Sequence, residues 1–337
     1  MRTGIVTGVI VAVIAAILFA SAGDPTGPAP FVVLGLTNGA IFGLVALGLV
    51  LVYKGTRVFN FAQGEFGTWA AFFAFMTMRE DGVGGLGLPY WAAILVALAG
   101  ALALGLLFER AIARPLLNAP RVTVLVATIA TALLFIGLQI VFFEIEPENL
   151  RGVFTSESAG WLSVKEFFGL NIDPQRQIAI VVLIVIGVLL AYFFSRTDLG
   201  LAVLATSQDP FATRVVGIGV ERMSRFIWGG AALLGGIAAL IYVPIAGLLV
   251  PGVMTSNILI PAFTGAVVGG MNSLPGAFLG GTTVGVVQAV ATWAVGHYHI
   301  GERAITEVVP ASEQISILLV LLIVLLARPA GLLGSEA

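Results

Sequence analysis

A run of polar side chains interrupts the apolar stretch between residues 58 and 78. Asn60, Gln63 and Glu65 lie at its start, where the neighbouring residues are apolar or glycine. Polar groups inside a membrane span are costly unless they find partners, and an ionisable residue there is a functional candidate by default. Two interpretations are open. Either Glu65 and Asn60 cap a helix whose dipole favours a carboxylate at its N-terminus, or these residues line the path of a solute.

A second pattern predicts a short helix between residues 209 and 217. Asp209 is a strong N-cap, Pro210 suits the first helical position, and Gly217 is well placed to end the helix. One face carries apolar residues at helical spacing, and Arg214 lies on another face; the apolar set is Phe211, Val215 and Ile218. The helix either lies on a membrane surface or inserts into a groove of a cytoplasmic partner.

Two further groups of residues are weaker candidates for a functional site. Asn272, Ser273 and Pro275 lie within the glycine-rich run 265–281, between two short apolar stretches. Small residues permit close helix packing, whereas broken helices at membrane depth often line a cavity. His297 and His299 form a His-x-His pair with no further ligands nearby, so we predict no metal site.

The residues needed for several kinds of catalysis are missing from the sequence. It holds no cysteine, and neither of its two lysines, Lys54 and Lys165, follows a glycine as a phosphate-binding loop requires. We predict no catalytic residue and no cofactor, so any ATP and magnesium must be bound by another chain. A membrane enzyme is disfavoured, because the apolar stretches offer no nucleophile, metal site or histidine.

The composition indicates a polytopic membrane protein. Of 337 residues, 59% are hydrophobic and 10% are charged, which is too few charges to coat a soluble fold. A net charge of −2 argues against a nucleic-acid partner. Ten apolar stretches approach the roughly 20 residues that a membrane helix needs, so we predict an all-α fold. They are 4–22, 31–53, 58–78, 89–108, 122–143, 177–195, 225–250, 257–272, 274–294 and 312–327.

The basic residues predict that the N-terminus is cytoplasmic, because inner loops of membrane proteins are enriched in lysine and arginine. Eleven fall on the inner side: Arg2, Lys54, Arg57, Arg110, Arg114, Arg121, Arg196, Arg214, Arg222, Arg225 and Arg328. Five fall outside: Arg79, Arg151, Lys165, Arg176 and Arg303. The first stretch is either a retained helix, which we favour, or a signal peptide cleaved after Ala20-Ser21-Ala22. Both alternatives leave the downstream topology unchanged.

We expect one transmembrane domain over residues 1–337, built from two halves at about 31–143 and 225–327. A cytoplasmic loop at 196–224 and an acidic outer loop at 144–176 separate the halves. Each half contains a glycine-rich group of spans, which hints at the internal repeat common in transporters. Only the third span holds an ionisable residue well inside it, so coupling to an ion gradient through a buried relay is disfavoured.

Four collinear stretches carry a resemblance to the permease subunits of the branched-chain amino-acid ABC transporter family. Residues 58–65 are similar to its NFAHGE motif, with Gln63 in place of the histidine. Residues 108–116 resemble its ERxxxRPL element, which consists here of Glu109, Arg110, Arg114 and Pro115. Residues 205–220 resemble its coupling-helix region, and residues 269–277 resemble its GGxxSxPGA turn.

The resemblance, which covers about residues 31–330, implies a transport subunit rather than an enzyme. Its expected partners are a second permease, two cytoplasmic ATPases, an external solute-binding protein and the lipid bilayer of a bacterial or archaeal cell (inner) membrane. The 210–217 helix is then expected to dock on an ATPase, whose closure on ATP would tilt the spans. Relatives are assigned to other amino acids, urea, short amides and aromatic acids as well, so the substrate stays open.

Three functional hypotheses follow. The first is an ABC importer permease for branched-chain or other amino acids. The second is an ion-coupled secondary transporter or a channel for a small polar or apolar solute, and the third is the disfavoured membrane enzyme. Co-purification with an ATPase from the same operon supports the first hypothesis, whereas uptake that collapses with a protonophore but survives loss of the ATPase supports the second.

Overall fold

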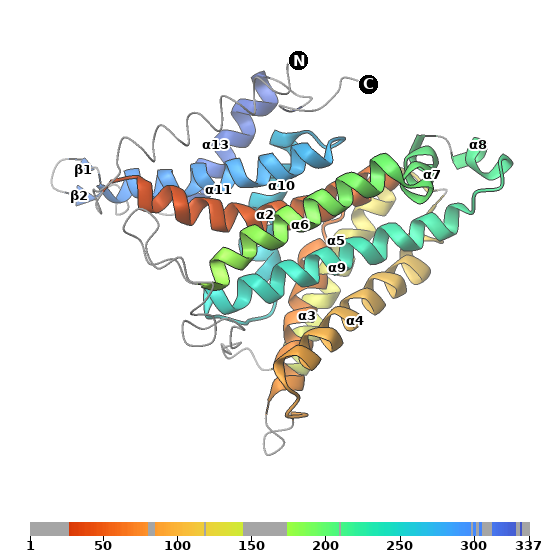
Figure 1. Ribbon diagram of the computed structural model, residues 1–337, viewed down its shortest axis with the longest axis horizontal. Coiled ribbons are helices and arrows are strands. Elements are labelled where there is room, and N and C mark those ends of the chain that lie inside the picture. Colours follow the sequence, from red (N-terminus) through yellow and green to blue (C-terminus); the bar gives the residue numbers. More distant parts are fainter. Residues whose placement is uncertain are drawn as a thin grey trace. The chain divides into compact units, whose positions relative to one another are not determined.

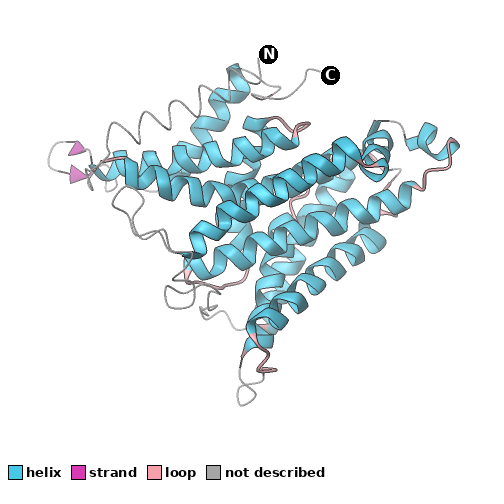
Figure 2. Ribbon diagram, in the orientation of Figure 1, coloured by secondary structure: helices cyan, strands magenta, loops and turns pink. Residues whose placement is uncertain are grey.

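The computed structural model describes residues 27–79, 85–117, 119–143, 174–208, 210–297, 299–300, 303–304, 312–327 and 331. Nearly all of these residues are helical, as Figure 2 shows. Besides the helices, the described residues contain one antiparallel pair of two-residue strands, β1 (His299–Ile300) and β2 (Arg303–Ala304). The expectation of a helical membrane protein is confirmed, and the strand pair is an addition that the sequence did not predict.

Eleven α-helices lie within the described residues. They are α2 (Ala29–Thr56), α3 (Gln63–Met78), α4 (Tyr90–Phe108), α5 (Arg121–Phe142), α6 (Pro174–Arg196), α7 (Asp198–Gln208), α8 (Pro210–Val215), α9 (Val220–Ala246), α10 (Ile260–Gly269), α11 (Leu274–His297) and α13 (Ser312–Ala327). Two π-helical turns adjoin them. Glu109–Ala113 extends α4, and Thr255–Leu259 leads into α10.

Six of the described helices are long and apolar enough to cross a bilayer: α2, α4 with its π-turn, α5, α6, α9 and α11. Helices α3, α10 and α13 coincide with three further predicted spans, but they are shorter. The first predicted span, 4–22, lies outside the described residues, as does most of the predicted outer loop. The chain is therefore a polytopic membrane protein, as predicted.

The segment predicted as a cytoplasmic loop, 196–224, is largely helical. It contains α7 and α8, and α9 begins at Val220, five residues before the predicted start of its span. The start is displaced because the helix continues beyond its apolar part into Glu221, Arg222 and Arg225, all of which are exposed. Hydropathy locates the apolar part of a span, whereas hydrogen bonding decides where the helix ends.

The chain divides into two compact units. The first comprises residues 1–46, 154–184 and 261–337, and the second comprises residues 47–153 and 185–260. Boundaries fall inside α2 and α6, so each of these helices contributes one part to each unit, and a further boundary follows Ile260, the first residue of α10.

In the second unit, α3, α4 and α9 pack against one another (Figure 1). The buried face of α4 is a stripe of small residues at four-residue spacing: Ala93, Ala97, Ala101 and Gly105. Its opposite face exposes large apolar residues, among them Leu95 at 69% and Leu107 at 60%. Small residues inside and large apolar residues outside are typical of helices that pack in lipid, where close backbone approach replaces hydrophobic burial.

The first unit uses the same principle with glycines. A Cβ built on Gly281 would collide with the backbone of Gly43, and one on Gly265 would lie 2.7 Å from the Cα of Gly281. The N-terminal part of α2 therefore approaches α11 at backbone contact distance. Helix α11 also packs against α13. This close contact supports packing as the role of the glycine-rich run 265–281.

Candidate functional site

Glu65 lies in the first turn of α3 and is completely buried, with 0% of its surface exposed. The Gln139 side chain on α5 donates a hydrogen bond from Nε2 to Glu65 Oε2 at 2.8 Å. The ion pairs of the described residues do not include Glu65. A buried carboxylate is expensive unless it is paired with a positive charge, whereas the described groups around Glu65 are the neutral amide of Gln139 and the hydroxyls of Thr255 and Thr68.

Gln139 also forms a hydrogen bond with a segment in which the helical backbone is interrupted. Its Oε1 accepts a hydrogen bond from the Gly252 N–H at 2.9 Å. The break runs from Gly247, which ends α9 with a φ of +66°, to Met254 before the next π-turn. Met254 N–H in turn donates to Thr68 Oγ1 at 3.3 Å. Side chains of α3 and α5 therefore satisfy two amides that the break leaves without helical partners.

The other oxygen of the Glu65 carboxyl group differs from the first. Glu65 Oε1 and Thr255 Oγ1 are both buried, and neither makes a hydrogen bond of good geometry within the described part of the chain. Thr255 packs against Gly64, and its hydroxyl lies beside the Glu65 carboxyl group together with that of Thr68. Unsatisfied buried polar atoms are uncommon in native proteins and call for an explanation.

Asn60 and Gln63 form a separate network at the start of α3. Asn60 Oδ1 accepts a hydrogen bond from the Ala62 N–H at 3.1 Å, and Asn60 Nδ2 donates to Gln63 Oε1 at 3.1 Å. Gln63 Nε2 donates to the Ala231 carbonyl of α9 at 2.7 Å. Both side chains are buried and engaged, which indicates that they fix the start of α3 against α9.

Asn272, Ser273 and Pro275 lie in the first unit, whereas Glu65 lies in the second. Ser273 Oγ accepts a hydrogen bond from the Gly276 N–H at 3.0 Å, as an N-cap of α11 does. Pro275 is in the first turn of that helix and is exposed. The geometry of this turn is that of a helix start.

The short helix predicted at 210–217 is present as α8. Val215 is 72% exposed, Arg214 is exposed and Ile218 is partly exposed. Gly217 adopts a φ of +85°, and its N–H donates to the Arg214 carbonyl at 3.0 Å, so the helix ends on this glycine as predicted. Asp209 lies outside the described residues, as do the side chains of Pro210 and Phe211.

The ERxxxRPL element forms an ion-paired corner at the end of α4. The π-turn places Arg114 beside Glu109, with Nε to Oε1 at 3.3 Å and Nη2 to Oε2 at 3.0 Å. Arg114 Nη1 also lies 3.1 Å from Glu221 Oε2 in the first turn of α9. Hydrogen bonding to Glu109 raises the pKa of Arg114 above its ordinary value. Arg110 and Pro115 are exposed, so Glu109 and Arg114 hold the corner.

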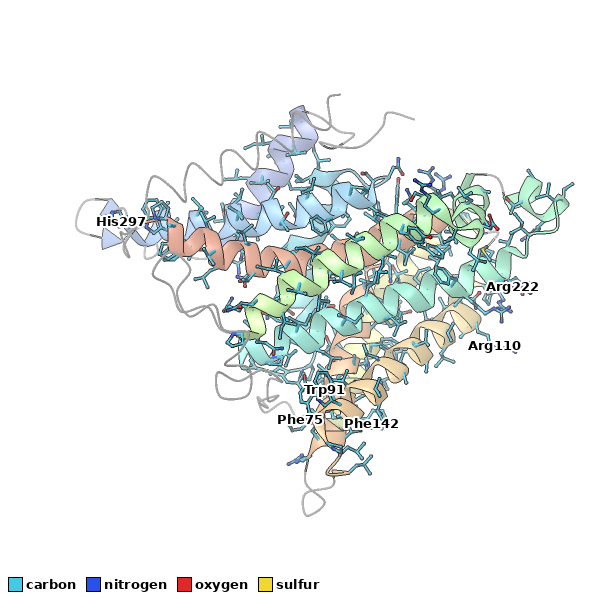
Figure 3. All side chains as sticks on the ribbon, viewed as in Figure 1. Phe75, Trp91, Arg110, Phe142, Arg222 and His297 are labelled. Carbon is cyan, nitrogen blue, oxygen red and sulfur yellow. The ribbon has the colours of Figure 1, made fainter. Side chains whose placement is uncertain are left out.

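The two ends of the second unit differ in chemistry, as Figure 3 shows. Phe75, Trp91 and Phe142 gather at one end of α3, α4 and α5, whereas Arg110 and Arg222 lie at the opposite end of α4 and α9. Aromatic belts and basic inner loops mark membrane interfaces.

In the first unit, the His297 ring stacks on Trp293 at 5.3 Å. His299 lies in β1, and the described residues hold no cluster of potential metal ligands.

The sequence analysis missed four residues of these sites: Gln139, Gly252, Thr255 and Glu221. Gln139 is an amide within the otherwise apolar stretch 122–143, and that contrast was a signal in the sequence. No signal in the sequence singled out Thr255 or Gly252, because hydroxyls and glycines are frequent in membrane helices. Glu221 joins the corner only through a contact with Arg114, which lies over 100 positions earlier in the sequence.

Comparisons with known proteins agree with this architecture. Residues 31–327 match the family model described as the permease component of branched-chain amino acid transport systems. The chain is 28% identical over 305 residues to BraD, a high-affinity branched-chain amino acid transport system permease protein of Pseudomonas aeruginosa, covering 89% of this chain and 94% of the relative.

Two further relatives come from an archaeon and a second bacterium. The chain is 28% identical to the probable branched-chain amino acid transport permease LivH of Methanocaldococcus jannaschii, over 87% of this chain and 88% of the relative. It is 25% identical to the high-affinity LivH permease of Escherichia coli K12, over 89% of this chain and 93% of the relative. No solved structure matches. The family match spans most of the chain, and the protein therefore belongs to the family of permease components of branched-chain amino acid transport systems.

Proposed function

We propose that the chain is the membrane-spanning permease of an ABC importer for branched-chain or other apolar amino acids. The match of residues 31–327 to the permease family carries this proposal. The working complex contains a second permease, identical or homologous, two cytoplasmic ATPase subunits and an external solute-binding protein. It operates in the cell (inner) membrane of a bacterium or archaeon. ATP and magnesium are bound by the ATPase subunits, since the sequence holds no glycine-lysine pair for a phosphate-binding loop.

The proposed topology has ten membrane spans in one domain, with the N-terminus in the cytoplasm and the two halves related by a repeat. The six long apolar helices support it. So does the second unit, whose arginine-rich and aromatic ends are separated by the length of α4. The orientation follows from the excess of basic residues on the inner side. The short helices α3, α10 and α13 are then the remaining spans of the described part.

The docking element of the proposal is α8 with its flanking residues. An apolar side chain exposed at the water-facing end of a membrane protein, such as Val215 at 72%, is favourable when a partner covers it. The docking surface consists of Asp209, Pro210, Phe211, Arg214, Val215, Gly217 and Ile218. Its exposed valine and arginine suit a groove with an apolar floor and an acidic rim.

Force from the ATPases reaches the spans through α9. Only Ile218 and Gly219 separate the end of the α8 turn at Gly217 from the start of α9 at Val220, and α9 packs along both α3 and α4. The Arg114–Glu221 ion pair adds a second link, from the first turn of α9 to the corner after α4. A displacement of α8 on ATP binding therefore moves a packed group of helices, which is the basis of alternating access. The residues proposed to lie along or beside the path of the transported solute are Asn60, Gln63, Glu65, Asn272, Ser273 and Pro275.

A charge reversal tests the docking surface. Asp209→Arg combined with Arg214→Glu should abolish co-purification with the ATPase subunits and lower ATP-driven uptake of leucine by at least about tenfold, because like charges would face the partner. The exposed Arg196 at the end of α6 offers a matched control, and Arg196→Glu should leave both measurements near wild type. Uptake retained by the double variant would disprove the docking surface.

Two measurements separate the importer from its alternatives. Uptake that survives removal of the ATPase but collapses with a protonophore would identify an ion-coupled carrier. A ligand screen of the solute-binding protein encoded beside this chain distinguishes amino acids from urea, amides and aromatic acids. We expect leucine, isoleucine or valine to bind.

A further inference from the structure

The two oxygens of the buried Glu65 carboxyl group differ in their hydrogen bonding. Oε2 accepts a hydrogen bond from Gln139, whereas Oε1 accepts none of good geometry among the described residues, although it is inaccessible to solvent. No basic side chain of the described part pairs with it. An ionised carboxylate in such a place is stable when a positive charge joins it. The vacant oxygen therefore fits a cation supplied from outside the chain.

We propose that Glu65 Oε1 and Thr255 Oγ1 bind the ammonium group of the transported amino acid as it crosses the second unit. This inference rests on the proposed function and names the part of the solute that the site recognises. An ammonium group has three N–H donors and no acceptor. The site offers the matching set, a carboxylate oxygen and an unsatisfied hydroxyl oxygen, with the Thr68 hydroxyl close by.

The surroundings favour a cation that carries an apolar body over a bare metal ion. Trp69 follows Glu65 by one turn of α3, and Phe135 precedes Gln139 by one turn of α5. Their rings meet edge to face at 6.2 Å, and Trp69 also contacts Phe142 and Phe143. Aromatic faces attract ammonium groups and accommodate aliphatic side chains. A sodium ion would gain little from these rings, because it binds through oxygen ligands.

The backbone opposite Glu65 is suited to a site that opens and closes. It is the helix break at 247–254, whose Gly252 has a φ of +74° and lies next to the carboxyl group: a Cβ there would be 3.9 Å from Oε1. Irregular backbone at membrane depth is tolerated where it is covered by protein or lines a cavity. In the closed arrangement Gln139 and Thr68 cover the break, and movement of α3 or α5 would uncover it.

The first experiment measures uptake and ATP hydrolysis in proteoliposomes that contain the complete transporter. Glu65→Gln keeps the size of the side chain and one oxygen that can accept the hydrogen bond from Gln139, but it removes the negative charge. We expect leucine uptake to fall about 10- to 100-fold, the range of one hydrogen bond to a charged group. ATP hydrolysis stimulated by the loaded binding protein should stay within about twofold of wild type. Glu65→Asp should restore part of the uptake.

A matched pair of threonines controls for the loss of a hydroxyl. Thr255→Val should lower uptake, because Thr255 Oγ1 is a proposed ligand. Thr77→Val on α3 should not, because the Thr77 hydroxyl is bonded to its own helix through the Phe73 carbonyl at 2.8 Å. Wild-type uptake by Glu65→Gln, or parallel losses of its uptake and ATP hydrolysis, would overturn the proposal.

The second experiment does not depend on transport. The midpoint of thermal unfolding of the purified complex is measured with 3-methylbutylamine, which is leucine without its carboxyl group, and with 4-methylpentanoate, which lacks the amine. We expect the amine to raise the midpoint of wild type but not of Glu65→Gln, and the acid to raise neither. Stabilisation by sodium over choline chloride that requires Glu65, with no effect of the amine, would instead identify a metal-ion site and overturn the proposal. If wild type shows no ATP-driven amino acid uptake, the proposed function fails, whereas the amine measurement still decides the ammonium site.

Discussion

Two glutamates of the second unit, Glu65 and Glu109, are equally buried but differently partnered. Each has 0% of its surface exposed. Glu109 faces the guanidinium of Arg114 through two hydrogen bonds, at 3.0 and 3.3 Å. Glu65 faces the neutral amide of Gln139, and its second oxygen is vacant. Among the described residues, a basic side chain pairs with the Glu109 carboxylate, whereas none pairs with that of Glu65.

This difference separates a structural carboxylate from a functional one. Glu109 ties the end of α4 to Arg114 and, through Arg114, to Glu221 on α9. Its interactions are complete without a ligand, so removing any part should cost stability. Glu65 is linked to the helix break through Gln139, whereas its other oxygen makes no hydrogen bond of good geometry with the described residues. Removing its charge should therefore cost transport more than stability, and four substitutions test this contrast.

The largest loss of stability is expected for Arg114→Met. This change keeps an unbranched side chain but leaves the Glu109 carboxylate buried without its cation. Breaking a buried pair from one side is strongly destabilising, and we expect the midpoint of thermal unfolding in detergent to fall by roughly 10 °C. Glu65→Gln in the same assay should stay within a few degrees of wild type. Equal losses in the two variants would contradict the proposed contrast.

Gln139→Leu should have an intermediate effect. It leaves the Gly252 N–H and Glu65 Oε2 without their hydrogen bonds. An unsatisfied buried polar group costs about 1–3 kcal/mol, and this amount should appear in the free energy of unfolding measured by denaturant titration. Thr131→Val on the same helix is the control, because the Thr131 hydroxyl bonds only to its own helix at Ala127. A neutral result for Gln139→Leu would show that the break does not depend on this amide.

Gln63→His tests how much the start of α3 depends on its particular amide. A neutral imidazole carries one donor and one acceptor, so it can replace the bond to the Ala231 carbonyl and the bond from Asn60. We expect uptake within about twofold of wild type, whereas Gln63→Leu, which loses both bonds, should cost about 1–3 kcal/mol of stability. A severe defect in the histidine variant, measured as leucine uptake, would mean that Gln63 has a role beyond these two bonds.

The smallest effect is expected for Glu221→Gln. Its side chain is 60% exposed, and ion pairs at such positions contribute about 0–1 kcal/mol. The unfolding midpoint should therefore change by no more than about 2 °C. If ATP-driven uptake nevertheless falls while stability and ATPase binding are retained, the Arg114–Glu221 pair transmits force from α8 to α4. Unchanged uptake would assign that transmission to the packing of α9 alone.

The sequence was sufficient for the helical membrane fold, for the approximate positions of the six long apolar helices, and for α8 with its glycine end. These features depend on local apolar runs and capping residues. It also located Glu65 and the ERxxxRPL element. It did not predict α7 or the start of α9 at Val220, because charged residues next to a span lower its hydropathy without ending its helix.

What the sequence determined by itself was the membrane environment, the order of the helices and the positions of the few polar residues among them. Only the tertiary structure decided which of those residues meet. Gln139 reaches Glu65 across 74 positions and Gly252 across 113, and Arg114 reaches Glu221 from a different helix. The physical reason is that hydropathy and capping act along the chain, whereas a buried charge is satisfied by partners that helix packing brings from elsewhere. In this way Glu109 is paired with Arg114, whereas Glu65 Oε1 has no hydrogen bond of good geometry among the described residues.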